Sequence, residues 1–291
     1  MSNINQLDKF LKIFEDEIRL LISREESPRE FRLLKNIEKG KLTNLFYEMG
    51  IENFSIIYNR QIIEAYYNPF NLINNYIQAP NITNDILEKI FIYLAHHEYG
   101  HSLFCKSTLN YAKFREKNND IIFENFGGRI RNNLCFLFWI LFVVLKESFA
   151  DFQVKKSNVN IPKYFFDINF KPFEQFLRIN KVTTIIDLGT LIDGFYSSVL
   201  YSSSWFFIFD QWDYLLEKCG ENDKMESINL IFMINKMLET LIKKELDLEG
   251  YKNYLIQLTL LLREIDYSML IYENNINRNI IERLDCLLAS I

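Results

Sequence analysis

Hydrophobic residues near the amino terminus recur every three or four positions, as on one face of an α-helix. Between residues 4 and 24 these positions are Leu7, Phe10, Leu11, Phe14, Ile18, Leu21 and Ile22. The pattern predicts an amphipathic helix with one apolar stripe, and we expect a second helix over residues 29–49. Asp8 interrupts the apolar positions early, so we expect this segment to be neither a secretory signal nor a membrane anchor.

Residues 53–79 have a different pattern, with short runs of β-branched and aromatic residues separated by Asn-Arg and Asn-Pro pairs. Runs of this kind, bounded by turn residues, are typical of β-strands. We therefore expect a small sheet over 53–79, with its last strand at 75–79. Elsewhere the chain shows no convincing strand pattern.

Two further stretches predict long helices. Residues 85–106 show helical periodicity and open with Asp85 and Glu88 at the spacing of a capping box. A helix over 132–156 contains the most apolar run of the chain, the twelve residues 134–145. As a helix this run covers about 18 Å, which is short of the roughly 30 Å hydrocarbon core of a bilayer. We expect burial in the protein core, with lipid contact through 134–145 as the alternative.

The rest of the chain, 161–291, also favours helices. Helical periodicity is present in 171–180, 183–218, 225–245, 247–269 and 276–290, and Pro162, Pro172, Gly220 and Gly250 stand where helices are expected to break or end. Nine glycines and five prolines in 291 residues agree with long helices. We expect a mostly α fold with a small mixed β-sheet, divided into residues 1–160 and a helical region 161–291 that completes or covers a cleft.

Charge and cysteine content exclude several classes of function. The net charge is −5, and the 33 basic residues form no dense block, so nucleic-acid binding is not expected. Four cysteines lie far apart without a C-x-x-C pair, which argues against a disulfide framework or a cysteine zinc site. These features favour a reducing, cytoplasmic compartment.

All three histidines of the chain, His96, His97 and His101, lie within six residues of the predicted helix 85–106. His97, Glu98 and His101 form the pattern H-E-x-x-H. Residues four apart on a helix lie above one another, so both imidazoles can bind one metal ion. Glu98 points toward the open side of such an ion, where its carboxylate can take a proton from bound water. His96 is not at ligand spacing, and we interpret it as a flanking residue or an outer contact of the site rather than a ligand.

A catalytic zinc ion needs a third protein ligand, and no histidine remains to provide it. Cys105 is eight residues after His97 on the same helix, about 12 Å along its axis, which is too far for a common ion. Glu147 is the better candidate, because it and Asp151 are spaced four apart directly after the most apolar run and bring two carboxylates to one side of the helix. We assign Glu147 to the metal and Asp151 to the outer N–H of a ligating histidine, His97.

This arrangement resembles the gluzincin metallopeptidases, in which H-E-x-x-H is followed by a helix bearing E-x-x-x-D. The HEYGH and ESFAD segments of this chain are most similar to the group that contains HtpX and the CAAX-processing peptidases. The resemblance covers about residues 70–152. It implies a zincin-like core with one zinc ion, in which the strand 75–79 pairs with an extended peptide or protein substrate. It also implies a metalloendopeptidase whose water is activated by Glu98.

The chain departs from that group in two respects, which leave alternatives open. It has only the short apolar run, whereas the membrane members have full-length spanning helices. It also has no histidine after 101 to stabilise the oxyanion, so Tyr196, Tyr201 or Arg178 would have to serve. The main alternative is therefore a catalytically weak or inactive zinc protein that acts as a sensor or a protein-interaction module. Two further alternatives are a membrane-associated protease and a metallopeptidase that cleaves repressor proteins.

Overall fold

The computed structural model describes residues 3–35, 54–58, 61–104, 143–178, 197–220 and 225–243. Most of these residues are helical, and the described strands form one small mixed sheet. At this level the expected fold class, mostly α with a small mixed β-sheet, is confirmed.

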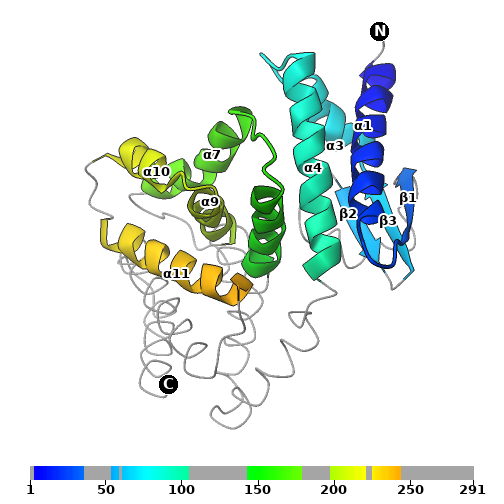
Figure 1. Cartoon of the computed structure of the whole chain (residues 1–291). Helices are drawn as coiled ribbons and strands as arrows, with labels where there is room; N and C mark the ends of the chain where they lie inside the picture. The colour runs from blue at the N-terminus through cyan, green and yellow to red at the C-terminus, as the bar shows by residue number, and fades with distance from the viewer. Residues whose placement is uncertain are drawn as a thin grey trace, which may run out of the picture. The chain divides into compact units, whose positions relative to one another are not determined.

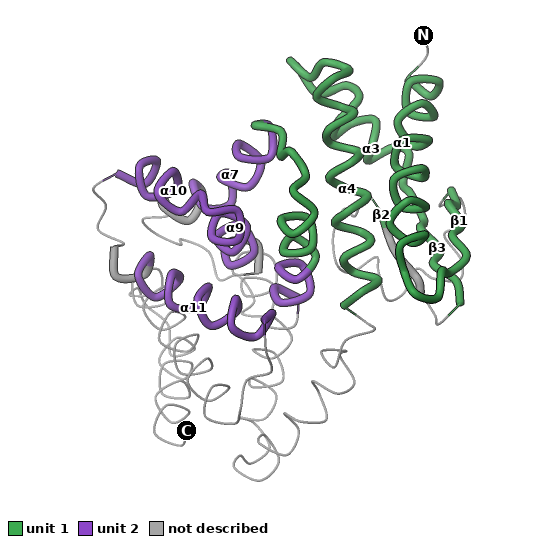
Figure 2. The backbone as a smooth tube through the Cα atoms, viewed as in Figure 1, with its two compact units in different colours: residues 1–107, 150–163 green, residues 108–149, 164–291 purple. Residues whose placement is uncertain are grey.

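The chain divides into two compact units, which Figure 2 shows in different colours. The first comprises residues 1–107 and 150–163, and the second comprises 108–149 and 164–291. One boundary falls within a helix that the structure describes from residue 143 to residue 156. Each unit is therefore built from two separate stretches of the sequence.

Two helices, α1 (Asn3–Ser23) and α4 (Asn84–Phe104), lie side by side in the first unit (Figure 1). The buried residues of α1 are the seven of the predicted apolar stripe, so the prediction for this helix is confirmed. Phe10 of α1 stacks on Phe91 of α4 with ring centroids 5.6 Å apart. The apolar stripe of α1 therefore packs directly on the helix that carries the histidines.

The sheet of the first unit has the strand order β1-β3-β2. Its strands are β1 (Glu30–Lys35), β2 (Phe54–Tyr58) and β3 (Ile62–Tyr67). β3 pairs in parallel with β1 and antiparallel with β2. The aromatic ring of Phe14 on α1 stacks on that of Phe54 in β2, with centroids 4.1 Å apart. This contact joins α1 to the sheet.

Strand β1 corrects the helix that the sequence predicted over 29–49. Residues 30–35 are extended and pair with β3, where Glu30 lies opposite Ile62, and residues 36–50 lie outside the described part of the chain. A six-residue segment of mixed polarity has no decisive local preference, so the available partner strand determines its conformation.

The strand expected at 75–79 is also wrong. Residues 69–77 form a short helix, α3 (Pro69–Leu72), followed by a π-helical turn, η2 (Ile73–Ile77). The side chain of Asn68 accepts hydrogen bonds from two backbone N–H groups, and Pro69 occupies the first turn. The Asn-Pro pair thus begins a helix here instead of separating two strands.

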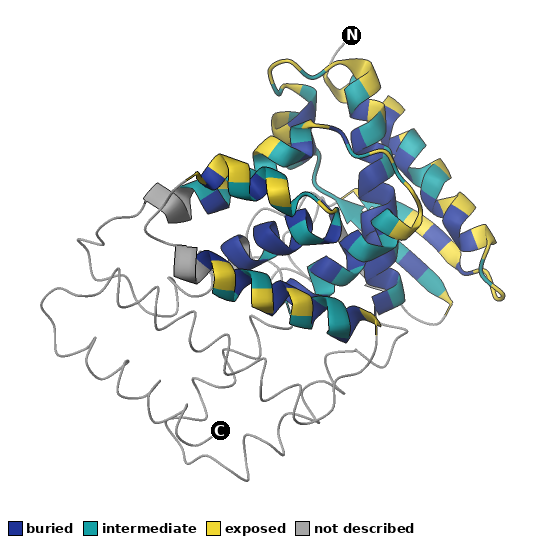
Figure 3. Cartoon of the chain, turned by 60° about the vertical axis from the view of Figure 1, so that its left-hand side comes forward, coloured by how far each residue is buried: buried dark blue, intermediate teal, exposed yellow. Residues whose placement is uncertain are grey.

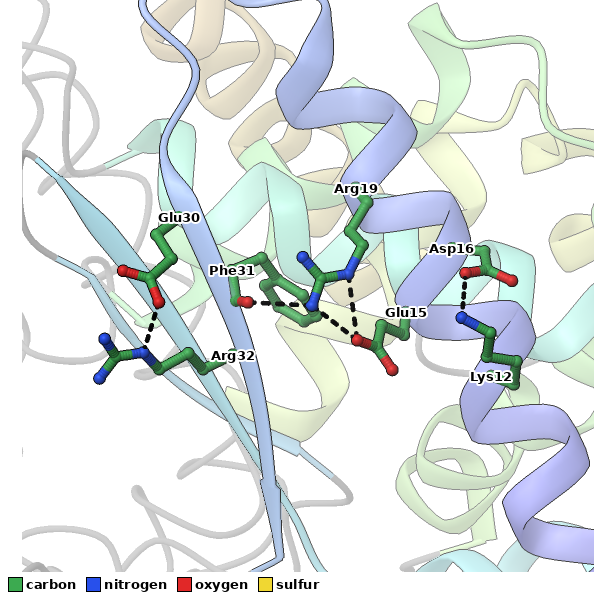
Figure 4. Close-up of polar contacts among 7 residues, drawn as sticks. All are labelled: Lys12, Glu15, Asp16, Arg19, Glu30, Phe31 and Arg32. Carbon is green, nitrogen blue, oxygen red and sulfur yellow. Dashed lines mark hydrogen bonds and ion pairs between the residues drawn. The ribbon is translucent and has the colours of Figure 1, made fainter.

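Polar contacts also link α1 to β1, as Figure 4 shows. The guanidinium group of Arg19 donates two hydrogen bonds to Glu15, at 3.0 and 2.7 Å, and one to the carbonyl oxygen of Phe31, at 3.2 Å. Arg19 also lies over the ring of Phe31, 5.5 Å from its centroid. Arg19 therefore connects the solvent-facing side of α1 to the first strand.

The second unit contains α7 (Tyr164–Arg178), α9 (Ser197–Ile208), α10 (Trp212–Cys219) and α11 (Met225–Lys243). Figure 3 shows that α11 has one buried and one exposed side, and its residues Ile228, Ile231, Ile234, Asn235, Leu238, Leu241 and Ile242 are buried. The helix expected over 225–245 is confirmed. The helices expected over 247–269 and 276–290 lie outside the described residues.

Two boundaries in the second unit differ from the prediction. Pro172 lies inside α7, which continues through it because Phe165, Asn169 and Phe173 form a buried stripe at helical spacing. Within the segment 183–218, helix α9 ends before Asp210, whose φ of 57° is left-handed and stops an α-helix. Gly220 caps α10 as expected, with a φ of 60°.

Within the part of the chain that the structure describes, no helix has both the length and the apolar character needed to cross a bilayer. The apolar run 134–145 lies mostly outside this part. Val144 and Leu145, at its end, are fully buried.

Candidate metal centre

The histidines of the H-E-x-x-H pattern lie on α4, as the sequence predicts. The helix begins where the hydroxyl of Thr83 accepts a hydrogen bond from the N–H of Ile86, at 3.3 Å. The predicted capping residue, Asp85, instead forms an ion pair with Lys89. The helix then runs without interruption through His97 and His101. Regular helical geometry therefore sets the spacing of the two imidazoles.

The imidazoles of His97 and His101 are neighbours on a buried side of α4. Their ring centroids are 4.7 Å apart and their planes are nearly perpendicular. Each residue is only 7% exposed. Burial of two adjacent polar rings has a free-energy cost unless their nitrogens are satisfied, which favours a functional role for the pair.

A carboxylate from the helix 143–156 completes a possible ligand set. His97, His101 and Glu147 each offer one ligand atom, and the three atoms all lie within 4.8 Å of one another. These three residues could therefore hold a metal ion. They are the residues that the sequence predicts as ligands.

Asp151, one helical turn after Glu147, contacts His97 in the expected manner. Its side chain is fully buried, and its Oδ1 lies 2.8 Å from Nδ1 of His97. When this carboxylate is ionised it can only accept hydrogen bonds, so the contact then requires the proton of the imidazole on Nδ1. The Nε2 atom then keeps the lone pair that a metal ligand requires.

A close approach of two backbones holds these helices together. A Cβ atom added to Gly100 would lie 2.7 Å from Cα and 3.0 Å from the carbonyl oxygen of Ala150. Only glycine therefore fits at position 100, between the two histidines. This contact sets the distance between α4 and the end of the helix that bears Glu147 and Asp151.

Glu98, the predicted proton acceptor, is 8% exposed and follows His97 directly on α4.

The next residue on α4, Tyr99, belongs to a separate polar network that joins this helix to the end of α1. The hydroxyl of Tyr99 donates to Glu25 at 3.0 Å, and Glu25 is paired with the buried Arg29 at 2.5 Å. Burial, followed by this hydrogen bond, raises the pKa of Tyr99 to about 12.

His96 has a different environment from the other two histidines. Its Nε2 lies 2.9 Å from Oε1 of Glu17 on α1. It is not part of the group His97, His101 and Glu147. The interpretation of His96 as a flanking residue agrees with this position.

The donor set is one that can hold a divalent metal ion. Two imidazoles and one carboxylate are common ligands of catalytic zinc, and at zinc–ligand distances of about 2.0–2.1 Å they lie roughly 3.4 Å apart. In this structure the three ligand atoms lie within 4.8 Å of one another, so at most a small closure of the side chains would bring them to that spacing. Among the described residues, Oδ2 of the fully buried Asp151 has no hydrogen-bond partner. A cation bound to His97 would offset that buried negative charge.

Tyr93 is a contact of this site that the sequence did not reveal. Its hydroxyl donates a hydrogen bond of 2.6 Å to Oδ1 of Asp151. The signal available in the sequence was its position four residues before His97, on the same side of α4. That spacing is common for core residues, so by itself it carried no indication of function.

The remaining residues that the sequence analysis considered lie either outside the described part of the chain or in the second unit. Cys105 and Tyr196 lie outside the described residues. Tyr201 and Arg178 belong to the second unit, in α9 and α7. Their role at an oxyanion stays a prediction.

Comparison with models of protein families, with curated protein sequences and with solved structures finds no match to this chain.

Proposed function

We propose that the protein is a zinc-dependent endopeptidase of the gluzincin type with a zincin-like core. The observation that supports this best is the grouping of His97, His101 and Glu147, with Asp151 hydrogen-bonded to His97. Histidines one turn apart, a carboxylate from a second helix and an acidic partner for the imidazole form the arrangement expected for a catalytic zinc site.

In this proposal His97, His101 and Glu147 hold the ion. When bound, zinc supplies a Lewis acid that polarises a carbonyl group and makes water more acidic. Asp151 keeps the proton of His97 on Nδ1, so that Nε2 faces the ion. The burial of both histidines limits the access of bulk water to the ligands.

Glu98 moves the proton in the proposed reaction. Its carboxylate accepts a proton from the attacking water as the oxygen adds to the peptide carbonyl carbon. It then donates that proton to the amine nitrogen as the carbon–nitrogen bond breaks. Water is consumed, and a carboxylic acid and an amine are formed. A neighbouring position on the ligand helix suits this role, because α4 fixes Glu98 relative to His97.

The proposal is tested by zinc analysis and by cleavage of an unfolded protein, measured on the same preparations. We expect about one zinc per chain in the wild type, and loss of zinc in His97→Ala and Glu147→Ala. Glu98→Gln should keep its zinc and lose hydrolysis by roughly 100-fold or more, because it removes only the proton acceptor. His96→Ala is the matched control, since it removes an adjacent buried histidine outside the ligand group.

Each outcome has a separate meaning. If the wild type binds no zinc, the site assignment is wrong. Retention of zinc by Glu147→Ala would remove Glu147 from the ligand set. Stoichiometric zinc with no metal-dependent cleavage would favour the alternative of a zinc-binding sensor or interaction module, which the lack of a histidine after residue 101 already supports.

A further inference from the structure

Two hydrogen-bond donors meet at one oxygen of Asp151. Nδ1 of His97 lies 2.8 Å from Oδ1, and the hydroxyl of Tyr93 lies 2.6 Å from the same atom. Asp151 is fully buried, and Tyr93 is almost fully buried. Because bulk water does not reach this carboxylate, these donors fix its orientation.

Tyr93 also contacts His97 directly. The two residues are four apart on α4, and their rings are nearly parallel, with centroids 5.9 Å apart and planes inclined by 20°. The ring of Tyr93 therefore packs beside the imidazole while its hydroxyl reaches the helix that bears Asp151. One side chain thus restrains both members of the His97–Asp151 pair.

The two restraints have a common consequence for His97. A carboxylate that turned about its terminal bond would no longer align with Nδ1, and the imidazole would lose the bond that selects its tautomer. Among the described residues, the other oxygen, Oδ2, has no partner that would resist this rotation. The hydroxyl of Tyr93 provides that resistance at Oδ1.

We propose that Tyr93 is a positioning residue of the metal site, which holds Asp151 so that His97 presents Nε2 to the ion. This inference rests on the proposed metal site. Tyr93 is not a ligand in this role, and it acts only through Asp151 and the ring of His97. The competing explanation is that Tyr93 is an ordinary core residue whose hydroxyl uses the nearest acceptor.

Tyr99 provides a matched control on the same helix. Its hydroxyl also donates to a carboxylate, that of Glu25, at 3.0 Å. Glu25 is paired with Arg29 and is not one of the grouped ligands. Tyr93→Phe and Tyr99→Phe therefore remove the same atom from the same helix, but only the first change affects the partner of His97.

The first measurement is the affinity for Co²⁺, followed through its visible absorption bands and by competition with a chelator. Loss of an outer partner of a metal ligand typically weakens metal binding 10- to 100-fold. We expect Tyr93→Phe to weaken Co²⁺ binding about 10-fold and to alter the absorption bands, and Tyr99→Phe to do neither. Asp151→Asn should weaken binding at least as much, and addition of Tyr93→Phe to it should cause little further loss, because both changes act through one contact.

The second measurement needs no metal and is made on the folded protein. Since all three histidines lie between residues 96 and 101, ¹⁵N-histidine labelling gives a simple nitrogen spectrum in which each tautomer is assigned directly. In the metal-free wild type we expect the proton of His97 on Nδ1. In folded Tyr93→Phe we expect a mixture of the two tautomers, with the wild-type tautomer retained in Tyr99→Phe.

The outcomes separate this inference from the proposed function. If the wild type fails to bind Co²⁺ or Zn²⁺, the metal site itself is wrong. If the wild type binds and Tyr93→Phe binds equally well, or its effect simply adds to that of Asp151→Asn, the positioning role is wrong and the metal site stands. A His97 proton on Nε2 in the metal-free wild type would also overturn the inference.

Discussion

Tyr99 shows how a single buried side chain responds to its surroundings. Burial disfavours the phenolate, and the hydrogen bond to Glu25 adds to this, so the pKa rises from 10.0 to about 12. The neutral phenol is therefore favoured by folding. Because the pKa is higher in the folded than in the unfolded chain, this stabilisation is complete below about pH 10 and is lost as the pH rises toward 12.

This effect gives a prediction for Tyr99→Phe. The variant cannot ionise at this position, so the stability advantage of the wild type over it should shrink between pH 10 and pH 12 and should be constant from pH 7 to 9. The free energy of unfolding in urea, measured for both proteins across this range, checks the prediction. Other groups such as Cys219, whose pKa is raised to about 11 by burial, titrate in both proteins and cancel in the difference. If the difference in the free energy of unfolding between the two proteins does not change with pH, the raised pKa of Tyr99 is wrong.

At the scale of elements, the approach of α4 to the helix 143–156 depends on Gly100. A Cβ at this position would lie 2.7 Å from a backbone atom of Ala150, which cannot rotate away. The contact lies between His97 and His101 on one helix and between Glu147 and Asp151 on the other. A change in helix separation here therefore changes the geometry of the whole ligand group.

We predict that Gly100→Ala forces the two helices apart and weakens metal binding. Overpacking of this kind typically costs about 1–3 kcal/mol, which exceeds the roughly 1 kcal/mol that alanine gains over glycine in a helix. Unfolding curves and Co²⁺ titrations test this. Ala150→Gly should not rescue the variant, because the nearest atoms of residue 150 belong to its backbone. Rescue by Ala150→Gly, or unaltered metal binding in Gly100→Ala, would show that the contact between Gly100 and Ala150 does not set the separation of the two helices.

The elements also differ in how well the sequence predicts them. The α1 stripe was predicted residue by residue, because seven apolar positions at helical spacing determine one buried face. Strand β1 was missed, because Glu30 and its neighbours are extended through pairing with a strand about thirty residues away. Similarly, Asn68 and Pro69 begin a helix through side-chain capping, although the same pair also suits a turn.

At the scale of the whole molecule, a bound metal ion would join two helices that are distant in sequence. A ligand that binds only the folded state raises its stability by RT ln(1 + [L]/Kd). We predict that zinc at about 100 times its Kd stabilises the wild type by about 2.7 kcal/mol, and that a chelator reverses this. The thermal midpoint of wild type, His97→Ala and His96→Ala, with and without zinc, measures the effect. An equal shift in His97→Ala would mean that zinc stabilises the protein from another site.

The sequence by itself determined the helices with strong periodicity, the one-turn spacing of His97 and His101, and the equal spacing of Glu147 and Asp151. These features are local, because helical geometry fixes which residues share a side. Only the tertiary structure decided which residues meet across the two helices. The contact of Gly100 with Ala150 brings Asp151 to His97, and the hydroxyl of Tyr93 reaches the same carboxylate. Such contacts depend on the relative position of segments about fifty residues apart, for which no local pattern contains the information.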